Sequence, residues 1–118
     1  MSDSGAAGSD DFLEVMRDTR GRYVAGFADQ LDHMRSLIAQ TGEGRLAALR
    51  TIAHRMAGLS GTLGFQTVGA AAADLEALVE AAHSSDAFSR DAALALIQRI
   101  GDAFTADLAT PPSWASKS

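Results

Sequence analysis

The sequence predicts an all-α protein, an up-down antiparallel four-helix bundle with a short extra N-terminal helix. Alanine and leucine, which lead the helix scale, supply much of the apolar content, whereas the aromatic residues that strands prefer make up 6% of the chain. No Asn-Gly or Asp-Gly pair offers a tight hairpin turn. Apolar residues recur at helical spacing in stretches joined by short connections, and short connections make consecutive helices antiparallel neighbours.

The first helical stretch runs from Asp11 to Gln40. Its apolar residues recur at the spacing of one helix face: Phe12, Val15, Met16, Tyr23, Phe27, Leu31, Met34 and Ile38. Gly21 and Gly26 weaken its middle, so we expect a short helix followed by a longer one. Residues 1–10 form a Ser/Asp/Gly/Ala tract that predicts a disordered lead.

Three further helices follow, each bounded by a turn signal. Their apolar stripes comprise Leu46, Leu49, Ala53, Met56 and Ser60, then Val68, Ala72, Leu75, Val79 and Ala82, then Ala93, Ile97, Ile100, Phe104 and Leu108. Gly64 is suited to a left-handed C-terminal cap, and residues 83–86 offer an N-cap for the last helix. Pro111 and Pro112 stop that helix. We therefore expect a bundle over residues 11–110 and a flexible tail over 111–118.

Composition excludes several functional classes. The absence of cysteine excludes a disulfide framework, a thiolate metal site and a cysteine nucleophile. A net charge of -5 without a basic stripe argues against nucleic acid as the main partner. No apolar run reaches the ~18 residues of a spanning helix, and the N-terminus lacks the features of a signal peptide. We expect a cytoplasmic monomer.

Few motifs for autonomous chemistry are present. The chain contains no Gly-rich phosphate loop, so we do not expect it to bind ATP. It has no HExxH sequence and no paired Glu-x-x-His, and we expect no metal site. The three histidines, His33, His54 and His83, lie on different predicted helices or their ends, so a tri-His metal bundle would require all three to converge.

His54 differs from the other two histidines in its surroundings. One helical face places it beside Arg50, Gly58 and Gly61. Glycine inside a helix costs about 1 kcal/mol relative to alanine, so two of them call for a reason. They can lower the surface so that another protein reaches the imidazole, or they can let two helices of this bundle pack closely around a structural His54. Spacing alone favours close packing.

The segment from Ala53 to Phe65, continued by the second half of the next helix, resembles a histidine-containing phosphotransfer (HPt) domain. The matching positions are a histidine, small residues after it, Leu-Gly, and Leu-Glu on the following helix: His54, Met56, Gly58, Ser60, Gly61, Leu63, Gly64, Phe65, Ala72, Leu75 and Glu76. This family has a four-helix bundle fold. The resemblance departs at Ala57, where the family usually has a lysine beside the phosphorylated histidine.

The resemblance implies that His54 accepts a phosphoryl group from a receiver-domain aspartate or a kinase and passes it to another receiver. It implies that Glu76 accepts the Nδ1 hydrogen and so orients the ring, as carboxylates do for histidine ligands. The implied partners are receiver domains and a histidine kinase, hybrid or not. Mg²⁺ is expected from the receiver, so this chain is a phosphocarrier that binds no cofactor, not an enzyme.

A docking surface is expected around His54. Arg50 and Arg55 lie within one turn of it and could supply the positive charge that Ala57 does not. Leu59 and Phe65, near Gly58 and Gly61, are candidates for an exposed apolar patch. The alternative function is a non-catalytic helical interaction module in which His54 is structural.

Overall fold

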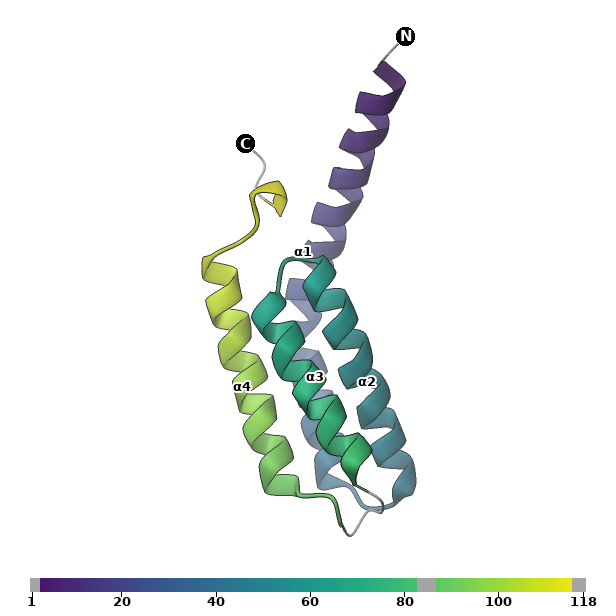
Figure 1. The fold of residues 1–118 in the computed structure, drawn as a ribbon, viewed down its shortest axis with the longest axis vertical. Coiled ribbons are helices and arrows are strands. Elements are labelled where there is room, and N and C mark those ends of the chain that lie inside the picture. The colour runs from purple at the N-terminus through teal and green to yellow at the C-terminus, as the bar shows by residue number, and fades with distance from the viewer. Residues whose placement is uncertain (1–2, 83–86, 116–118) are drawn as a thin grey trace.

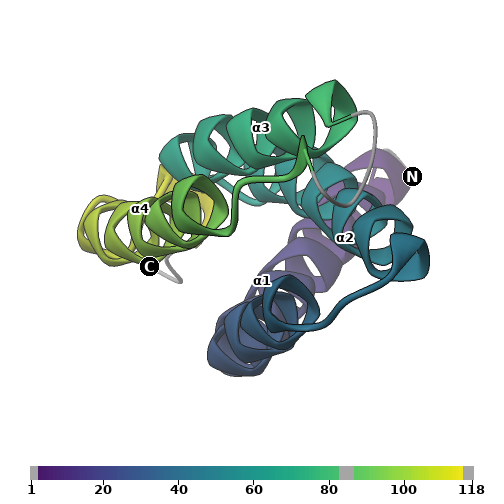
Figure 2. The same ribbon diagram turned by 90° about the horizontal axis from the view of Figure 1, so that it is seen from below.

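The computed structural model describes residues 3–82 and 87–115. It confirms the all-α fold class: the elements are α1 Asp3–Ala39, α2 Glu43–Thr62, α3 Gln66–Ala81, α4 Arg90–Ala109 and a 3-10 turn, η2, Ser113–Ala115. No strand is present in those residues. The four helices alternate in direction and close into a ring in which α2 and α3, α3 and α4, α1 and α2, and α1 and α4 pack together (Figures 1 and 2).

The first helix is continuous from Asp3 to Ala39, so the expected division into a short helix and a longer one is wrong. A Cβ at Gly21 or Gly26 would meet nothing within 4 Å, so neither glycine marks a close approach that breaks the helix. Packing of this helix against the bundle outweighs the local cost of glycine, as tertiary context often does. The separate extra helix is therefore not found among the described residues. Residues 1 and 2 of the predicted lead lie outside them, and the domain boundary at residue 10 stays a prediction.

The N-terminal part of α1 extends beyond the other helices (Figure 1). Phe12 and Val15 are 62% and 61% exposed there. Further along the chain, all four helices contribute to one apolar core. Its largest fully buried side chains are Phe65, Met34, Ile38, Leu49, Met56, Leu63, Leu75, Ile97, Ile100 and Val68.

The turn between α2 and α3 fixes how these two helices meet. Gly64 has φ of +90°, which confirms the predicted left-handed residue after α2. The backbone N–H of Phe65 donates to the carbonyl of Ser60 at 2.7 Å and closes the turn. At the start of α3 the backbone N–H of Val68 donates to the carboxylate of Asp107 on α4 at 3.0 Å. This carboxylate satisfies a helix N–H group that Phe65 at the N-cap cannot.

The start of α4 differs from the expectation. Ser89 is its N-cap, and its hydroxyl accepts a hydrogen bond from the backbone N–H of Ala92 at 3.2 Å. The N-cap predicted within residues 83–86, which lie outside the described residues, is therefore wrong. In the predicted tail, η2 packs against α1, and the Nε of Arg17 donates to the carbonyl of Trp114 at 3.0 Å.

Candidate functional site

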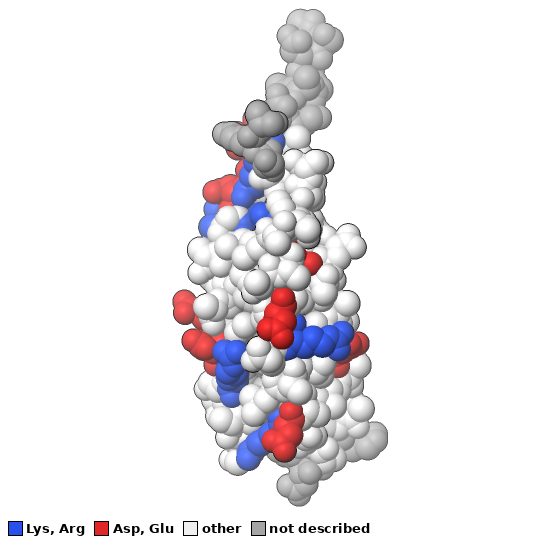
Figure 3. All heavy atoms as spheres, turned by 90° about the vertical axis from the view of Figure 1, so that its left-hand side faces the viewer, with Lys and Arg blue, Asp and Glu red and all other residues white. Residues whose placement is uncertain are grey.

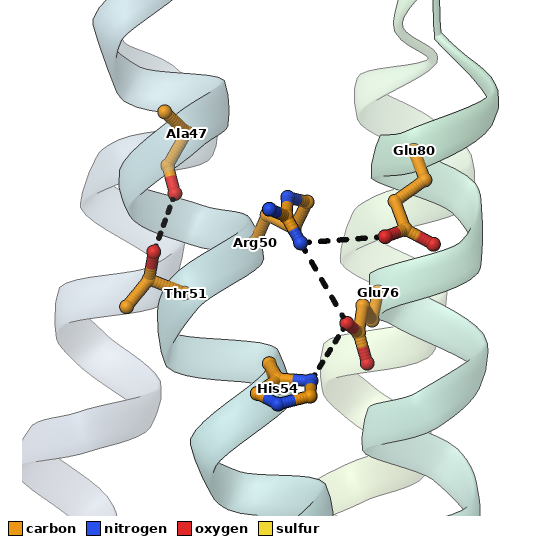
Figure 4. Close-up of polar contacts among 6 residues, drawn as sticks. All are labelled: Ala47, Arg50, Thr51, His54, Glu76 and Glu80. Atoms are coloured by element: carbon orange, nitrogen blue, oxygen red, sulfur yellow. Dashed lines mark hydrogen bonds and ion pairs between the residues drawn. The ribbon is translucent and has the colours of Figure 1, made fainter.

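His54 lies on α2 with its side chain 72% exposed, facing the neighbouring helix α3. Its Nδ1 is 2.8 Å from Oε2 of Glu76, whose side chain is only 18% exposed (Figure 4). The structure thus brings together His54 and Glu76, to which the family resemblance assigned the roles of phosphoacceptor and orienting carboxylate. They are 22 positions apart in the chain, and the packing of α2 on α3 makes them adjacent.

The pair has a defined chemical consequence. An ionised carboxylate only accepts hydrogen bonds, so the hydrogen of this contact belongs to Nδ1 of the imidazole. In the neutral ring the other nitrogen, Nε2, then carries the lone pair. The exposed imidazole therefore offers a nucleophilic nitrogen to solvent while its other side is held by Glu76.

Close packing between α2 and α3 depends on Gly69, which the sequence reasoning did not single out. A Cβ at this position would lie 3.2 Å from the backbone carbonyl oxygen of Ala57 on α2. Even alanine there would require this carbonyl to give way by a few tenths of an ångström. The available signal was the run of small residues at the start of α3, Gly69 to Ala73. Gly69 is what allows α3 to approach the helix that carries His54.

Gly58 and Gly61 have the opposite environment. A Cβ at either would meet nothing within 4 Å, so the interpretation that they serve close packing inside this bundle is wrong. Both are exposed on α2. The surface beside His54 is low because these positions have no side chain, which is the geometry that access by a partner requires.

The two candidate apolar residues have different environments. Leu59 is 43% exposed and remains a candidate for the patch. Phe65 is fully buried, so its assignment to an exposed patch is wrong. Its ring packs against Tyr23 and Phe104, with the guanidinium of Arg20 4.4 Å from its centroid. The signal that was missed is its spacing of three from Val68, which continues the buried stripe of α3 backwards.

Arg50 and Arg55 are also placed differently. The Nη1 of Arg50 lies 3.3 Å from Oε2 of Glu80 and 3.9 Å from Oε2 of Glu76 (Figure 4). Arg50 is therefore on the Nδ1 side of His54 and engaged with two carboxylates. Arg55 is exposed, with no ion pair in the described part of the chain. No cation occupies the position of Ala57, whose carbonyl faces Gly69.

The other histidines do not join this site. His33 is exposed on α1, and His83 lies outside the described residues, which leaves the tri-His alternative untested. No group of three or more His, Cys, Asp or Glu side chains suited to a metal ion is found in residues 3–82 and 87–115. On the face of the molecule drawn in Figure 3, acidic and basic side chains lie next to one another without an extended basic area.

A comparison with protein-family models matches residues 11–109 to the Hpt domain. This chain belongs to the Hpt domain family. The match confirms the resemblance carried by the His54 segment and extends it over most of the chain. Searches of curated proteins and of solved structures returned no match.

Membership states the function at the level of the family. Hpt domains carry out histidine phosphotransfer in phosphorelay signalling, together with receiver domains and kinases of two-component systems. They are phosphocarriers rather than catalysts. Among the residues described for this Hpt domain, no helix has the length and hydropathy that crossing a membrane requires.

Proposed function

We propose that this Hpt domain accepts a phosphoryl group on Nε2 of His54 and passes it to an aspartate of a receiver domain. The observation that supports this assignment is the 2.8 Å contact between Nδ1 of His54 and Glu76, which leaves Nε2 as the free nitrogen of an exposed ring. His33 is exposed as well, but no carboxylate contact is found for it among the described residues. His54 is therefore the histidine whose surroundings match the chemistry.

On the side of this Hpt domain, the transfer step uses only the ring of His54 and the carboxylate of Glu76. The Nε2 lone pair of His54 attacks the phosphorus of an aspartyl phosphate, the bond to the aspartyl oxygen breaks, and the electron pair leaves on the receiver carboxylate. The phosphorylated ring keeps its Nδ1 hydrogen and is positively charged. The carboxylate of Glu76 faces that charge. In the forward transfer an aspartate oxygen of the next receiver attacks the phosphorus, and the electron pair returns to Nε2.

The partner supplies what this chain lacks. The transition state of phosphoryl transfer is loose, so neutralising charge on the phosphoryl oxygens and aligning the groups are the main requirements. We propose that Mg²⁺ and a lysine of the receiver domain provide this neutralisation in each transfer between His54 and a receiver; where a kinase is the donor, the kinase provides it. The open surface at Gly58 and Gly61, with Leu59 beside it, would admit that domain as a transient, partly apolar interface. We further propose that the carrier acts as a monomer in the cytoplasm.

The test is labelling of the purified domain by a phosphorylated receiver in the presence of Mg²⁺. His54→Gln should lose the acid-labile, alkali-stable label of phosphohistidine, while the matched variant His33→Gln keeps it. Retention of label in His54→Gln would refute the assignment. If the unsubstituted domain takes no label from any competent receiver, the alternative of a helical interaction module with a structural His54 is favoured.

A further inference from the structure

Four charged or titratable side chains form a continuous chain across the gap between α2 and α3. Glu80 and Glu76 lie one turn apart on α3, and Arg50 and His54 lie one turn apart on α2. The contacts alternate between the helices: Glu80 to Arg50 at 3.3 Å, Arg50 to Glu76 at 3.9 Å, and Glu76 to His54 at 2.8 Å (Figure 4). The proposed function uses only the last of these contacts.

Two atoms in this row of four side chains each take part in two contacts. Oε2 of Glu76 is the oxygen that accepts from Nδ1 of His54 and also the oxygen nearest to Arg50. Nη1 of Arg50 is the nitrogen that donates to Glu80 and also the nitrogen nearest to Glu76. The hydrogen bond to Glu80 therefore holds the guanidinium at ion-pair distance from Glu76, where it attracts the carboxylate without replacing His54 as its hydrogen-bond donor.

The exposed fractions of these side chains indicate which of the four depends on the others. Glu76 is 18% exposed, whereas Arg50 and Glu80 are 50% and 54% exposed. A carboxylate with little access to water is costly to bury unless positive charge or hydrogen-bond donors lie close to it. His54 supplies one donor, and Arg50 brings a full positive charge within 3.9 Å of the same oxygen.

We propose that Arg50 and Glu80 are positioning residues that act on His54 through Glu76. Glu80 anchors Arg50, Arg50 fixes the ionised carboxylate of Glu76, and Glu76 selects the Nδ1–H tautomer that leaves Nε2 free. This inference rests on the proposed function for its biological meaning, but its physical content concerns the unphosphorylated protein. It gives Arg50 a role on the Nδ1 side of the ring, which differs from replacing the lysine that is absent at Ala57.

The tautomer of His54 is the direct readout. ¹⁵N NMR of the imidazole distinguishes Nδ1–H from Nε2–H in the protein as it is, without receiver or phosphate, at a pH where the ring is neutral. We expect Arg50→Ala and Glu80→Ala each to lower the ratio of Nδ1–H to Nε2–H about two- to fivefold, the size expected for loss of a half-exposed ion pair. Glu76→Ala marks complete loss of the preference, and Arg50→Lys, which keeps the charge, should recover part of it.

Arg99→Ala is the matched control. Arg99 on α4 pairs with Asp74 on α3 at 2.7 Å and is 53% exposed, so this variant removes a similar ion pair from the same helix α3 without touching the chain at His54. The ratio should stay at its unsubstituted value. If Arg50→Ala leaves the ratio unchanged as well, the inference is overturned, and if only Glu80→Ala leaves it unchanged, the role of Glu80 is overturned.

Failure of this inference and failure of the proposed function are separable. A wild-type ratio in Arg50→Ala together with normal labelling of His54 would refute the positioning role and leave phosphotransfer intact. A lowered tautomer ratio in Arg50→Ala, together with an unsubstituted domain that no receiver labels, would support the positioning role while refuting the proposed function. When both hold, the transfer rate of Arg50→Ala should fall by the same factor as the fraction of rings in the Nδ1–H form, which the measured ratio gives, because only that form presents Nε2 for attack.

Discussion

Replacing Gly58 and Gly61 separates a folding role from a docking role. Glycine inside a helix costs about 1 kcal/mol relative to alanine, and a Cβ at either position meets nothing within 4 Å. Gly58→Ala should therefore raise the free energy of unfolding by about 1 kcal/mol, and Gly61→Ala, in the last turn of α2, by less. In a domain of this size that corresponds to about 4 °C in Tm, which thermal unfolding followed by circular dichroism measures.

The rate of phosphoryl transfer should fall when these glycines are replaced, although the stability rises. Gly58→Gln places a side chain one helical turn from His54, on the surface that we propose for docking of a receiver. We expect the rate of phosphoryl transfer from a receiver to fall about tenfold, which corresponds to about 1.4 kcal/mol of lost docking or alignment, while the helical signal is kept. Gly58→Ala, with a single methyl group, should fall between the glutamine variant and the unsubstituted protein.

A control for added bulk comes from α4. Ala95 is exposed there, and α4 lies on the other side of α3 from α2 (Figure 2). Ala95→Gln should leave transfer unchanged. Two results would refute the reasoning: a lower Tm for Gly58→Ala would mean that the position is packed, and wild-type transfer by Gly58→Gln would mean that the open surface is not used for access.

Three further predictions concern the turn, the core and the surface charge. Gly64→Ala forces alanine to φ of +90° and its Cβ to within 2.5 Å of the side chain of Pro112, so the free energy of unfolding should fall by about 2 kcal/mol or more, and an unchanged Tm would contradict this. Burial raises the pKa of Tyr23, so its hydroxyl ionises first in the unfolded chain, and stability should be fully present below about pH 10 and fall above it; Tyr23→Phe should flatten that alkaline decline in denaturant titrations. Arg50→Ala combined with Arg55→Ala should slow transfer more than either change alone, and added salt should narrow the difference from the unsubstituted protein; equal rates for Arg50→Ala and the double variant at low salt would show that Arg55 does not compensate for the missing lysine.

The sequence predicted the helices well where local signals and tertiary packing agree. Apolar spacing and the turn at Gly64 place α2 and α3 nearly as observed, since the same residues form the stripes and the core. The prediction failed where packing overrides a local preference. Gly21 and Gly26 weaken a helix in isolation, but α1 continues through both because its flanking residues pack on the bundle.

The site was predictable in part, and for different reasons at each residue. His54 stands out from its neighbours Gly58 and Gly61, but the partner Glu76 came from the family resemblance, not from any pattern in the chain. The contact between Arg50 and Glu80 joins residues 30 positions apart, and no local signal specifies it. Such contacts depend on how far α3 is shifted along α2, and apolar periodicity leaves that shift undetermined.

Gly69 shows how the position of α3 along α2 determines the geometry of the site. Gly69 lets α3 approach the carbonyl of Ala57, and this close approach sets Glu76 opposite His54 about two turns further along α3. A lysine at position 57 would leave that backbone contact in place, because the contact uses only the carbonyl. The missing lysine therefore changes the charge on α2 within one turn of His54 without changing this backbone contact. In the proposed transfer, Glu76 orients the ring whatever residue stands at position 57, and Arg55 or the receiver supplies the charge that neutralises the phosphoryl group.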